Sequence, residues 1–151
     1  MADIVDKQTR SRMMRGIRGK DTKPETALRR ALHAKGLRFR LHTARLPGKP
    51  DIVFPKFNAV VFVHGCFWHR HNNCRFSKSP KTRTEFWRQK FDANVARDSR
   101  NQNQLAEMGW RVAIVWECGL RNVKDTANTA ERIEAWLQSK QNFLEIGIDA
   151  E

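Results

Sequence analysis

The run Ala59-Val60-Val61-Phe62-Val63 decides the fold of this 151-residue chain. Five consecutive apolar residues, three of them valines, predict a strand that is covered on both faces, because a half-exposed strand would alternate with polar residues. Residues 55–58 predict a turn before this strand, and residues 51–54 predict a shorter strand before the turn. The centre of the fold is therefore expected to be a sheet enclosed between other elements.

Helix and strand patterns alternate on either side of this centre. Thr22-Lys23-Pro24-Glu25 predicts a helix start, with Thr22 as N-cap and Glu25 completing a capping box, and Gly36 predicts the helix end. Residues 37–41 alternate in polarity and predict a half-buried strand. Beyond a loop at 64–82, the pattern predicts a helix at 83–108, a strand at 112–116 and a helix at 126–138.

The order α-β-β-β-α-β-α predicts an α/β fold with a mixed central sheet and helices on its faces. We divide the chain into an N-terminal arm at 1–20, a domain at 21–140 and a tail at 141–151, for which the pattern gives no assignment. The arm is polar and basic, with Met13, Met14 and Ile17 as a thin apolar stripe.

The charge of the chain indicates its class of partner. Twenty-nine Lys and Arg against 16 Asp and Glu give a formal net charge of +13. This predicts a polyanion, most commonly nucleic acid, although such a charge also serves simply to keep a protein soluble. Neither a membrane span nor a signal peptide is evident, so we expect a cytoplasmic protein with no membrane partner. In that compartment three cysteines predict metal ligands or buried thiols.

Asp51 follows Pro50 at the head of a predicted strand. The element order resembles the αβββαβ core of the PD-(D/E)xK nuclease superfamily, which carries an acid at this position. The D/E-x-K of the third strand is absent, and Phe62-Val63-His64 stands there. His64 is able to exchange a proton or offer positive charge near a phosphodiester, and Asp51 with the Val63 carbonyl offers oxygens to Mg²⁺. The alternative is that Asp51 is only a turn residue.

All three cysteines fall into a pattern with one histidine, Cys66-x4-His71-x2-Cys74 followed by Cys118. Three thiols and one imidazole suit tetrahedral Zn²⁺, and a full protein set leaves no open position, so the site would be structural. The alternative is three unrelated small apolar residues and a surface histidine. From the residues alone, His69 and His71 are interchangeable as the fourth ligand.

Aromatic residues surround the predicted zinc loop, namely Phe67, Trp68 and Trp87. Exposed aromatic side chains on a basic loop indicate a partner, and rings inserted between base pairs would unstack a duplex. Met14 on the arm offers a second wedge. The alternative is that these rings close one end of the core. His64 and His69 flank Cys66, where a histidine near a bound phosphate would act as a general base.

Together with the motifs above, the run Val63-His64-Gly65-Cys66-Phe67-Trp68-His69 resembles the very short patch repair (Vsr) mismatch endonuclease family. The resemblance covers roughly residues 6–137 and is most specific in the run from Val63 to His69. The carrying residues are Asp21-Thr22 with Glu25, Leu46-Pro47-Gly48-Lys49-Pro50-Asp51, Val63-His64-Gly65-Cys66-Phe67-Trp68-His69, Thr82-Arg83-Thr84-Glu85-Phe86-Trp87, Asn94-Val95 with Arg97-Asp98, Gly109-Trp110-Arg111-Val112 and Ile114-Val115-Trp116-Glu117-Cys118.

The resemblance implies an enzyme that nicks one DNA strand 5′ to the thymine of a T:G mismatch arising from 5-methylcytosine deamination. The implied catalytic residues are Glu25, Asp51, His64, His69 and Asp98. Asp51 and the Val63 carbonyl would hold Mg²⁺, and His69, supported by Asp98, would activate the attacking water. His64 and Glu25 would act through the water shell of the metal and through the phosphate.

The resemblance also implies how the protein grips DNA. Zn²⁺ would be held by Cys66, His71, Cys74 and Cys118. Phe67, Trp68 and Trp87 would intercalate beside the mismatch from the major groove, and the arm with Met14 would clamp the minor groove. Residues 70–79 depart from the His-rich stretch of the family, and Val63 replaces a threonine.

The expected partner is double-stranded DNA with a T:G mismatch, bound by a monomer, and the family adds mismatch-repair proteins. Two alternatives remain open. A zinc-containing DNA-binding module without activity explains the charge and the Cys₃His set, but does not need Asp51, His64 and His69 together. A restriction-type nuclease would cut both strands of matched DNA, normally as a dimer, and the sequence shows no dimer surface.

Overall fold

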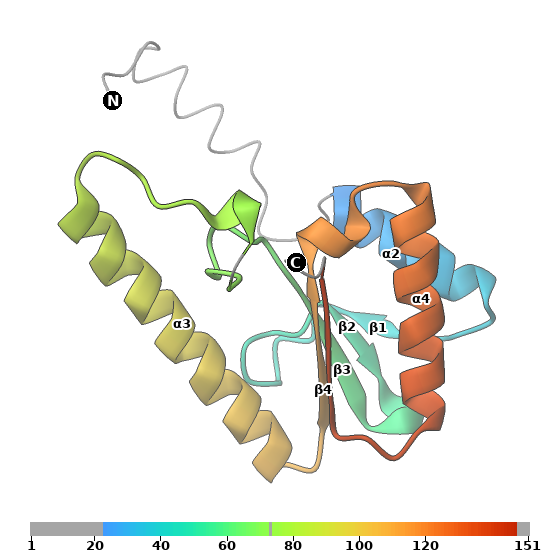
Figure 1. The fold of residues 1–151 in the computed structure, drawn as a ribbon. Coiled ribbons are helices and arrows are strands. Elements are labelled where there is room, and N and C mark those ends of the chain that lie inside the picture. Colours follow the sequence, from blue (N-terminus) through green and yellow to red (C-terminus); the bar gives the residue numbers. More distant parts are fainter. Residues whose placement is uncertain (1–22, 73, 148–151) are drawn as a thin grey trace.

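The computed structural model describes residues 23–72 and 74–147, in which helices cover both faces of a five-stranded sheet (Figure 1). The strands lie in the order β1-β2-β3-β4-β5, with bounds Arg40–Leu41, Ile52–Phe54, Ala59–His64, Arg111–Trp116 and Phe143–Ile146. The first three strands are antiparallel neighbours, whereas β4 runs parallel to both β3 and β5. The mixed α/β fold expected from the sequence is confirmed.

Among the described residues, three helices enclose this sheet. Helices α2 (Lys23–Ala34) and α4 (Val123–Gln138) cover one face, and the 24-residue α3 (Thr84–Glu107) lies on the other (Figure 1). Short 3₁₀ turns lie at η1 (Pro55–Phe57), η2 (Arg75–Ser77) and η3 (Glu117–Leu120). Along the described residues the order is the expected α-β-β-β-α-β-α, followed by one further strand.

Strand β3 is apolar throughout because both of its faces are covered. Val60 and Phe62 pack into the cluster that includes Leu105 of α3. Val61, on the opposite face, packs into the larger cluster that includes Leu28 of α2. Alternate residues of one strand thus serve two separate cores, which explains the continuous run that the sequence shows.

The strand expected at 37–41 is reduced to two exposed residues, Arg40 and Leu41. The cause lies in the end of helix α2. Gly36 has φ +87°, and the Leu37 N–H donates to the Leu32 carbonyl at 3.3 Å. Leu37 therefore terminates the helix and enters the core instead of pairing in the sheet.

The last two elements extend beyond their expected bounds. Helix α4 begins three residues early, because the Asn122 side chain caps it by accepting from the Asp125 N–H at 2.8 Å. Val123 is 88% exposed, so apolar periodicity does not mark this first turn. Strand β5 lies within the segment set apart as a tail, and Ile146 is its only buried residue. Four residues with one buried side chain are too short for alternation to identify them.

Candidate active site

Asp51 enters strand β2 from a turn that is fixed against helix α3. Gly48 and Lys49 both have positive φ, +77° and +51°. A Cβ on Gly48 would lie 3.0 Å from the Asn101 side chain of α3, so the backbone approaches the helix as closely as glycine permits. The Asp51 carboxylate then accepts a hydrogen bond from the Val63 N–H at 2.7 Å through Oδ2. This turn aims Asp51 at the end of strand β3.

Glu25 and His42 lie beside Asp51. The His42 Nε2 atom is 3.4 Å from Glu25 Oε1, and its Nδ1 atom is 3.8 Å from Asp51 Oδ1. Glu25 is only 2% exposed, so its role is more than that of a capping-box residue; Thr22, its expected partner in the box, lies outside the described residues. One potential ligand atom from each of the three residues lies within 4.8 Å of the others, which suits a metal ion.

The environment of Asp51 favours a cation. Burial raises the pKa of this carboxyl from 3.8 to about 7, the Val63 hydrogen bond opposes the rise, and the neighbouring Glu25 carboxylate adds to it. Two carboxylates at one site disfavour each other's charged forms unless a positive charge lies between them. A divalent ion is such a charge, and the donor set therefore fits a metal.

His64 and His69 stack face to face beside this group. Their ring centroids are 3.9 Å apart with an interplanar angle of 7°. His64 is 5% exposed, and burial lowers its pKa to about 3, with His69 contributing, so it is neutral at neutral pH. His69 Nδ1 lies 2.6 Å from Asp98 Oδ2 of helix α3. The imidazole tautomer that donates to this carboxylate carries a lone pair on Nε2, as a general base requires.

A single cavity of about 640 Å³ joins the two groups. His42 and Asp51 line it, together with His64, His69 and Asp98. Glu25 meets it through His42. The structure thus brings the expected catalytic side chains of α2, β2, β3, α3 and the loop after β3 to one place. Proton exchange and metal binding are possible side by side there.

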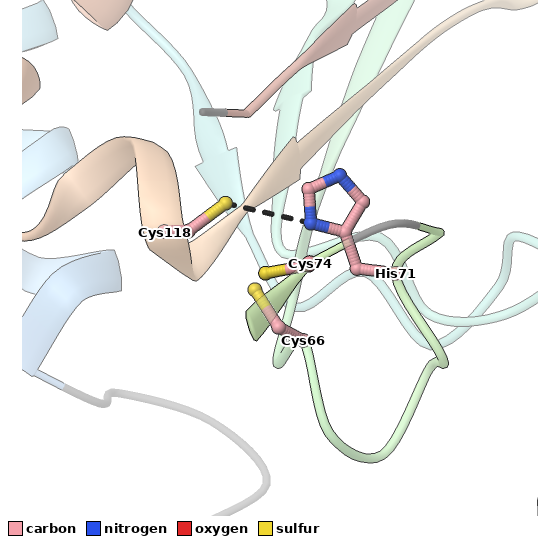
Figure 2. A group of neighbouring side chains, drawn as sticks. All are labelled: Cys66, His71, Cys74 and Cys118. Atoms are coloured by element: carbon pink, nitrogen blue, oxygen red, sulfur yellow. Dashed lines mark hydrogen bonds between the residues drawn. The ribbon is translucent and has the colours of Figure 1, made fainter. Parts of the chain in front are cut away.

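The three cysteines gather with His71 in a separate group, and Figure 2 shows their side chains converging. Their potential ligand atoms lie within 4.8 Å of one another, and Cys118 Sγ is 3.4 Å from His71 Nδ1. The His71 ring stacks on Trp116 at 4.3 Å. Of the two interchangeable histidines, the structure brings His71 to the thiols and His69 to Asp98.

The thiol cluster fits a soft metal ion. Burial raises the pKa of Cys66 to about 12, and the Cys118 and Cys74 thiols add to the rise although a Cys118 backbone hydrogen bond opposes it. The Cys66 thiol therefore ionises with difficulty on its own, and a bound Zn²⁺ would stabilise its thiolate. The ligands would join the loop after β3 to the η3 turn after β4.

Phe67, Trp68 and Trp87 form an aromatic cluster with Phe91 of α3. Phe67 lies 5.1 Å from Trp68 and 6.0 Å from Trp87, centroid to centroid, and 5.2 Å from Phe91. The Arg70 guanidinium lies 4.1 Å from the Phe91 ring centroid and donates to the Phe67 carbonyl. The three rings are half-buried, in a layer between the loop and α3. The fourth expected wedge, Met14, lies outside the described residues.

Comparison with known proteins shows which family this chain belongs to. Residues 2–75 match the family model described as DNA mismatch endonuclease Vsr. The DNA mismatch endonuclease Vsr of Escherichia coli (strain K12) is 50% identical over 91% of this chain and 88% of its own length. The type II nicking enzyme V.XorIIP of Xanthomonas oryzae pv. oryzae is 50% identical over 82% of this chain and 90% of its own. The chain belongs to the Vsr family.

Membership in the Vsr family confirms the enzyme class expected from the sequence, an endonuclease. A further relative, the type II nicking enzyme V.NmeAIP of Neisseria meningitidis, is 44% identical over 81% of this chain. Within residues 23–72 and 74–147, no helix is both long and apolar enough to cross a membrane.

Sequence reasoning missed His42 in this Vsr family member. In the sequence, Leu37, Phe39 and Leu41 alternate with polar residues, and His42 stands out only as one more of these polar positions. The register gives the signal that could have found it: Arg40 pairs with Val53 and Leu41 with Ile52, so the next position places His42 opposite Asp51. The run Leu46-Pro47-Gly48-Lys49-Pro50 between the two strands is typical of a turn, and two strands joined by a turn indicate such a hairpin.

Proposed function

We propose that this endonuclease nicks one strand of double-stranded DNA, 5′ to the thymine of a T:G mismatch, and so initiates very short patch repair of deaminated 5-methylcytosine. The observation that carries the proposal is the His69–Asp98 pair beside Asp51 in one cavity. It joins a general base to a metal-binding carboxylate, which hydrolysis of a phosphodiester needs. The similarity to a DNA mismatch endonuclease and to nicking enzymes supports mismatched DNA as the substrate.

The fold is consistent with a PD-(D/E)xK core. Elements α2, β1, β2, β3, α3 and β4 follow the αβββαβ order of that superfamily. Asp51 precedes β2 directly, and His64 ends β3, where the superfamily has its lysine. His64 is stacked, buried and neutral, so it would serve as a hydrogen-bonding and proton-exchanging group rather than as a fixed positive charge.

Mg²⁺ would be held by Asp51 and the Val63 carbonyl. The N–H and C=O of one strand residue point to the same side, and the Val63 N–H already bonds Asp51. The Val63 carbonyl therefore faces the edge at which Asp51 lies. When bound there, Mg²⁺ would neutralise the phosphate charge and polarise a water molecule. Glu25 would hydrogen-bond the water shell of the ion from its buried position.

His69 would take the proton of the attacking water at Nε2. Asp98 would hold the ring in the required tautomer and stabilise the imidazolium that forms, since a carboxylate 2.6 Å from Nδ1 favours positive charge on the ring. The cleaved strand would carry a 5′-phosphate and a 3′-hydroxyl. Zn²⁺ on the Cys₃His cluster would be structural, fixing the loop that presents His69 and the aromatic rings.

Mismatch choice would come from the aromatic cluster. Phe67, Trp68 and Trp87 are already packed together on α3, so little conformational entropy would be lost when they enter a stack. A wobble pair resists such a wedge less than a matched pair does, because its unstacking costs less. The arm with Met14 would contact the minor groove, and a monomer suffices because only one strand is cut.

The test uses end-labelled duplexes that carry one T:G mismatch in several flanking sequences, with matched duplexes as controls. The proposal predicts a nick on the thymine strand only, dependent on Mg²⁺, and Asp51→Ala should abolish it while sparing binding. Binding without cutting would favour the zinc-containing binding module. Cutting of both strands of matched DNA would favour a restriction-type nuclease.

A further inference from the structure

We propose that His42 is a nitrogen ligand of the catalytic metal, alongside Asp51 and the Val63 carbonyl, and that the centre consequently binds Mn²⁺ or a similar first-row transition ion more tightly than Mg²⁺. The inference rests on the proposed function, because it concerns the ion used for nicking. It adds a residue to the metal centre and specifies the class of metal.

The separation between His42 and Asp51 suits a shared ion. Two neighbouring ligands at ~2.1 Å from an octahedral ion lie ~3 Å apart. His42 Nε2 is 3.4 Å from Glu25 Oε1, and its Nδ1 is 3.8 Å from Asp51 Oδ1. Potential ligand atoms of all three residues lie within 4.8 Å of one another. A shift of just under 1 Å, from 3.8 Å to the ~3 Å of neighbouring ligands, would bring Nδ1 and Asp51 Oδ1 onto one ion, while Nε2 stays beside Glu25.

The backbone holds His42 in this position. His42 has φ +48°, a conformation that non-glycine residues adopt infrequently, and its N–H donates to the Asp51 carbonyl at 3.2 Å. Its side chain is 20% exposed and lines the same cavity as Asp51. This uncommon backbone conformation directs the His42 ring to a position between the Glu25 and Asp51 carboxylates. Such a conformation costs free energy, and residues that adopt one cluster at functional sites.

The two Asp51 oxygens have different partners. Oδ2 accepts from the Val63 N–H, and Oδ1 is the oxygen that faces His42. The ion proposed for Asp51 and the Val63 carbonyl would thus have His42 at its open side. Neither His64 nor His69 takes that place, since these rings stack on each other and His69 Nδ1 bonds Asp98.

The donor atoms determine the metal preference. Mg²⁺ is a hard ion that proteins bind through oxygen, whereas first-row transition ions also accept imidazole nitrogen. A centre built from one carboxylate, a carbonyl and one imidazole therefore favours the transition ion. If His42 only supplied positive charge to the carboxylates, an incoming ion would displace it, and the ratio of the Mn²⁺ and Mg²⁺ affinities would not depend on the imidazole.

Electron spin echo envelope modulation of Mn²⁺ bound to the full-length protein tests the proposal directly. We expect ¹⁴N coupling in the wild type, replaced by ¹⁵N coupling when the protein is labelled with ¹⁵N-histidine, and lost in His42→Gln. The matched control is His33→Gln, which removes an exposed histidine of α2 and should keep the coupling. Zinc content and circular dichroism report on folding, and His42→Asn serves if His42→Gln does not fold.

Calorimetric titration with MnCl₂ and MgCl₂ gives the second measurement. His42→Gln should weaken Mn²⁺ binding by about tenfold or more and change Mg²⁺ binding much less, so the ratio of the two affinities narrows. Absence of ¹⁴N coupling in the wild type, or unchanged coupling in a folded His42 variant, would overturn the inference. Failure of the His42 inference would leave the proposed mismatch nicking unaffected. Absence of nicking with either ion would reject the proposed function even if His42 binds Mn²⁺.

Discussion

His69 Nδ1 lies 2.6 Å from Asp98 Oδ2, although 29 residues separate them in the sequence. The loop after β3 supplies the imidazole, and helix α3 supplies the carboxylate. Because the aromatic cluster packs on the same helix, the position of α3 links the general base to the surface proposed to meet DNA.

Asp98→Asn should lower the single-turnover nicking rate by about 10²–10⁴-fold, the usual contribution of general acid–base catalysis. The amide keeps the shape but does not favour the protonated His69 ring, so the rate falls while binding of mismatched DNA remains. The control is Asp92→Asn, an exposed carboxylate on the same helix. A wild-type rate for Asp98→Asn, measured with saturating duplex, would contradict the role of the pair.

Cys118→Ser should reduce the zinc content of the purified protein and lower its melting temperature. Cys118 follows β4, whereas Cys66, His71 and Cys74 lie in the loop after β3, so its loss separates the loop from the sheet. Elemental analysis and thermal melts check both effects, with the exposed Ser99→Ala as control. Equal zinc in Cys118→Ser and the wild type would show that the cluster does not need this ligand.

The pKa of Asp51 predicts a pH-dependent stability when zinc is retained but no Mg²⁺ or Mn²⁺ is added. The folded-state pKa is about 7 against an ordinary 3.8, so between these values the folded protein holds a proton that the unfolded chain has lost. The Asp51 contribution to the free energy of unfolding therefore falls as pH rises through this window, by at most about 1.4 kcal/mol per pH unit.

Comparison with Asp51→Asn isolates this contribution. His64, whose pKa is lowered to about 3, acts in the opposite direction between about pH 3 and 6.5, but it is common to both proteins. Urea unfolding from pH 5 to 8 should show the variant gaining stability relative to the wild type as pH rises. Added Mg²⁺ at pH 8 should stabilise only the wild type. Parallel pH curves for the two proteins would refute the assignment.

The sequence predicts the inner part of the fold better than its edges. The apolar run that includes Val60 and Val61 predicts a strand covered on both faces, and in the structure β3 packs against a core cluster on each face. Leu37 shows the limit, since its polarity fits a strand but its N–H terminates α2. Strand β5 has one buried residue, Ile146, and depends on pairing with β4, which no local pattern reveals.

The residues of the candidate site could be predicted where residue type and motif agree. Their partners could not be predicted where they depend on the direction in which a histidine ring points. His69 and His71 are separated by Arg70, whose φ of +55° turns the backbone between them. One ring then meets Asp98 and the other the thiols, a difference that spacing does not encode. His42 required strand register, which follows from tertiary pairing.

Arg111→Met should destabilise the fold by about 2–4 kcal/mol without changing the nicking rate of the folded protein. The Arg111 guanidinium donates to the carbonyls of Trp136, Leu137, Ser139 and Gln141, and it lies over the Trp136 ring at 4.6 Å. These bonds satisfy the carbonyls at the end of α4, which Met would leave without their charged donor.

Arg111 begins β4, whereas the active site lies at the opposite end of β3 and β4, so the chemistry should be unaffected. Urea unfolding measures the loss, and Arg132→Met, at an exposed position of α4, controls for removing a charge. Equal destabilisation in the two variants would mean that net charge, and not the carbonyl contacts, accounts for the effect.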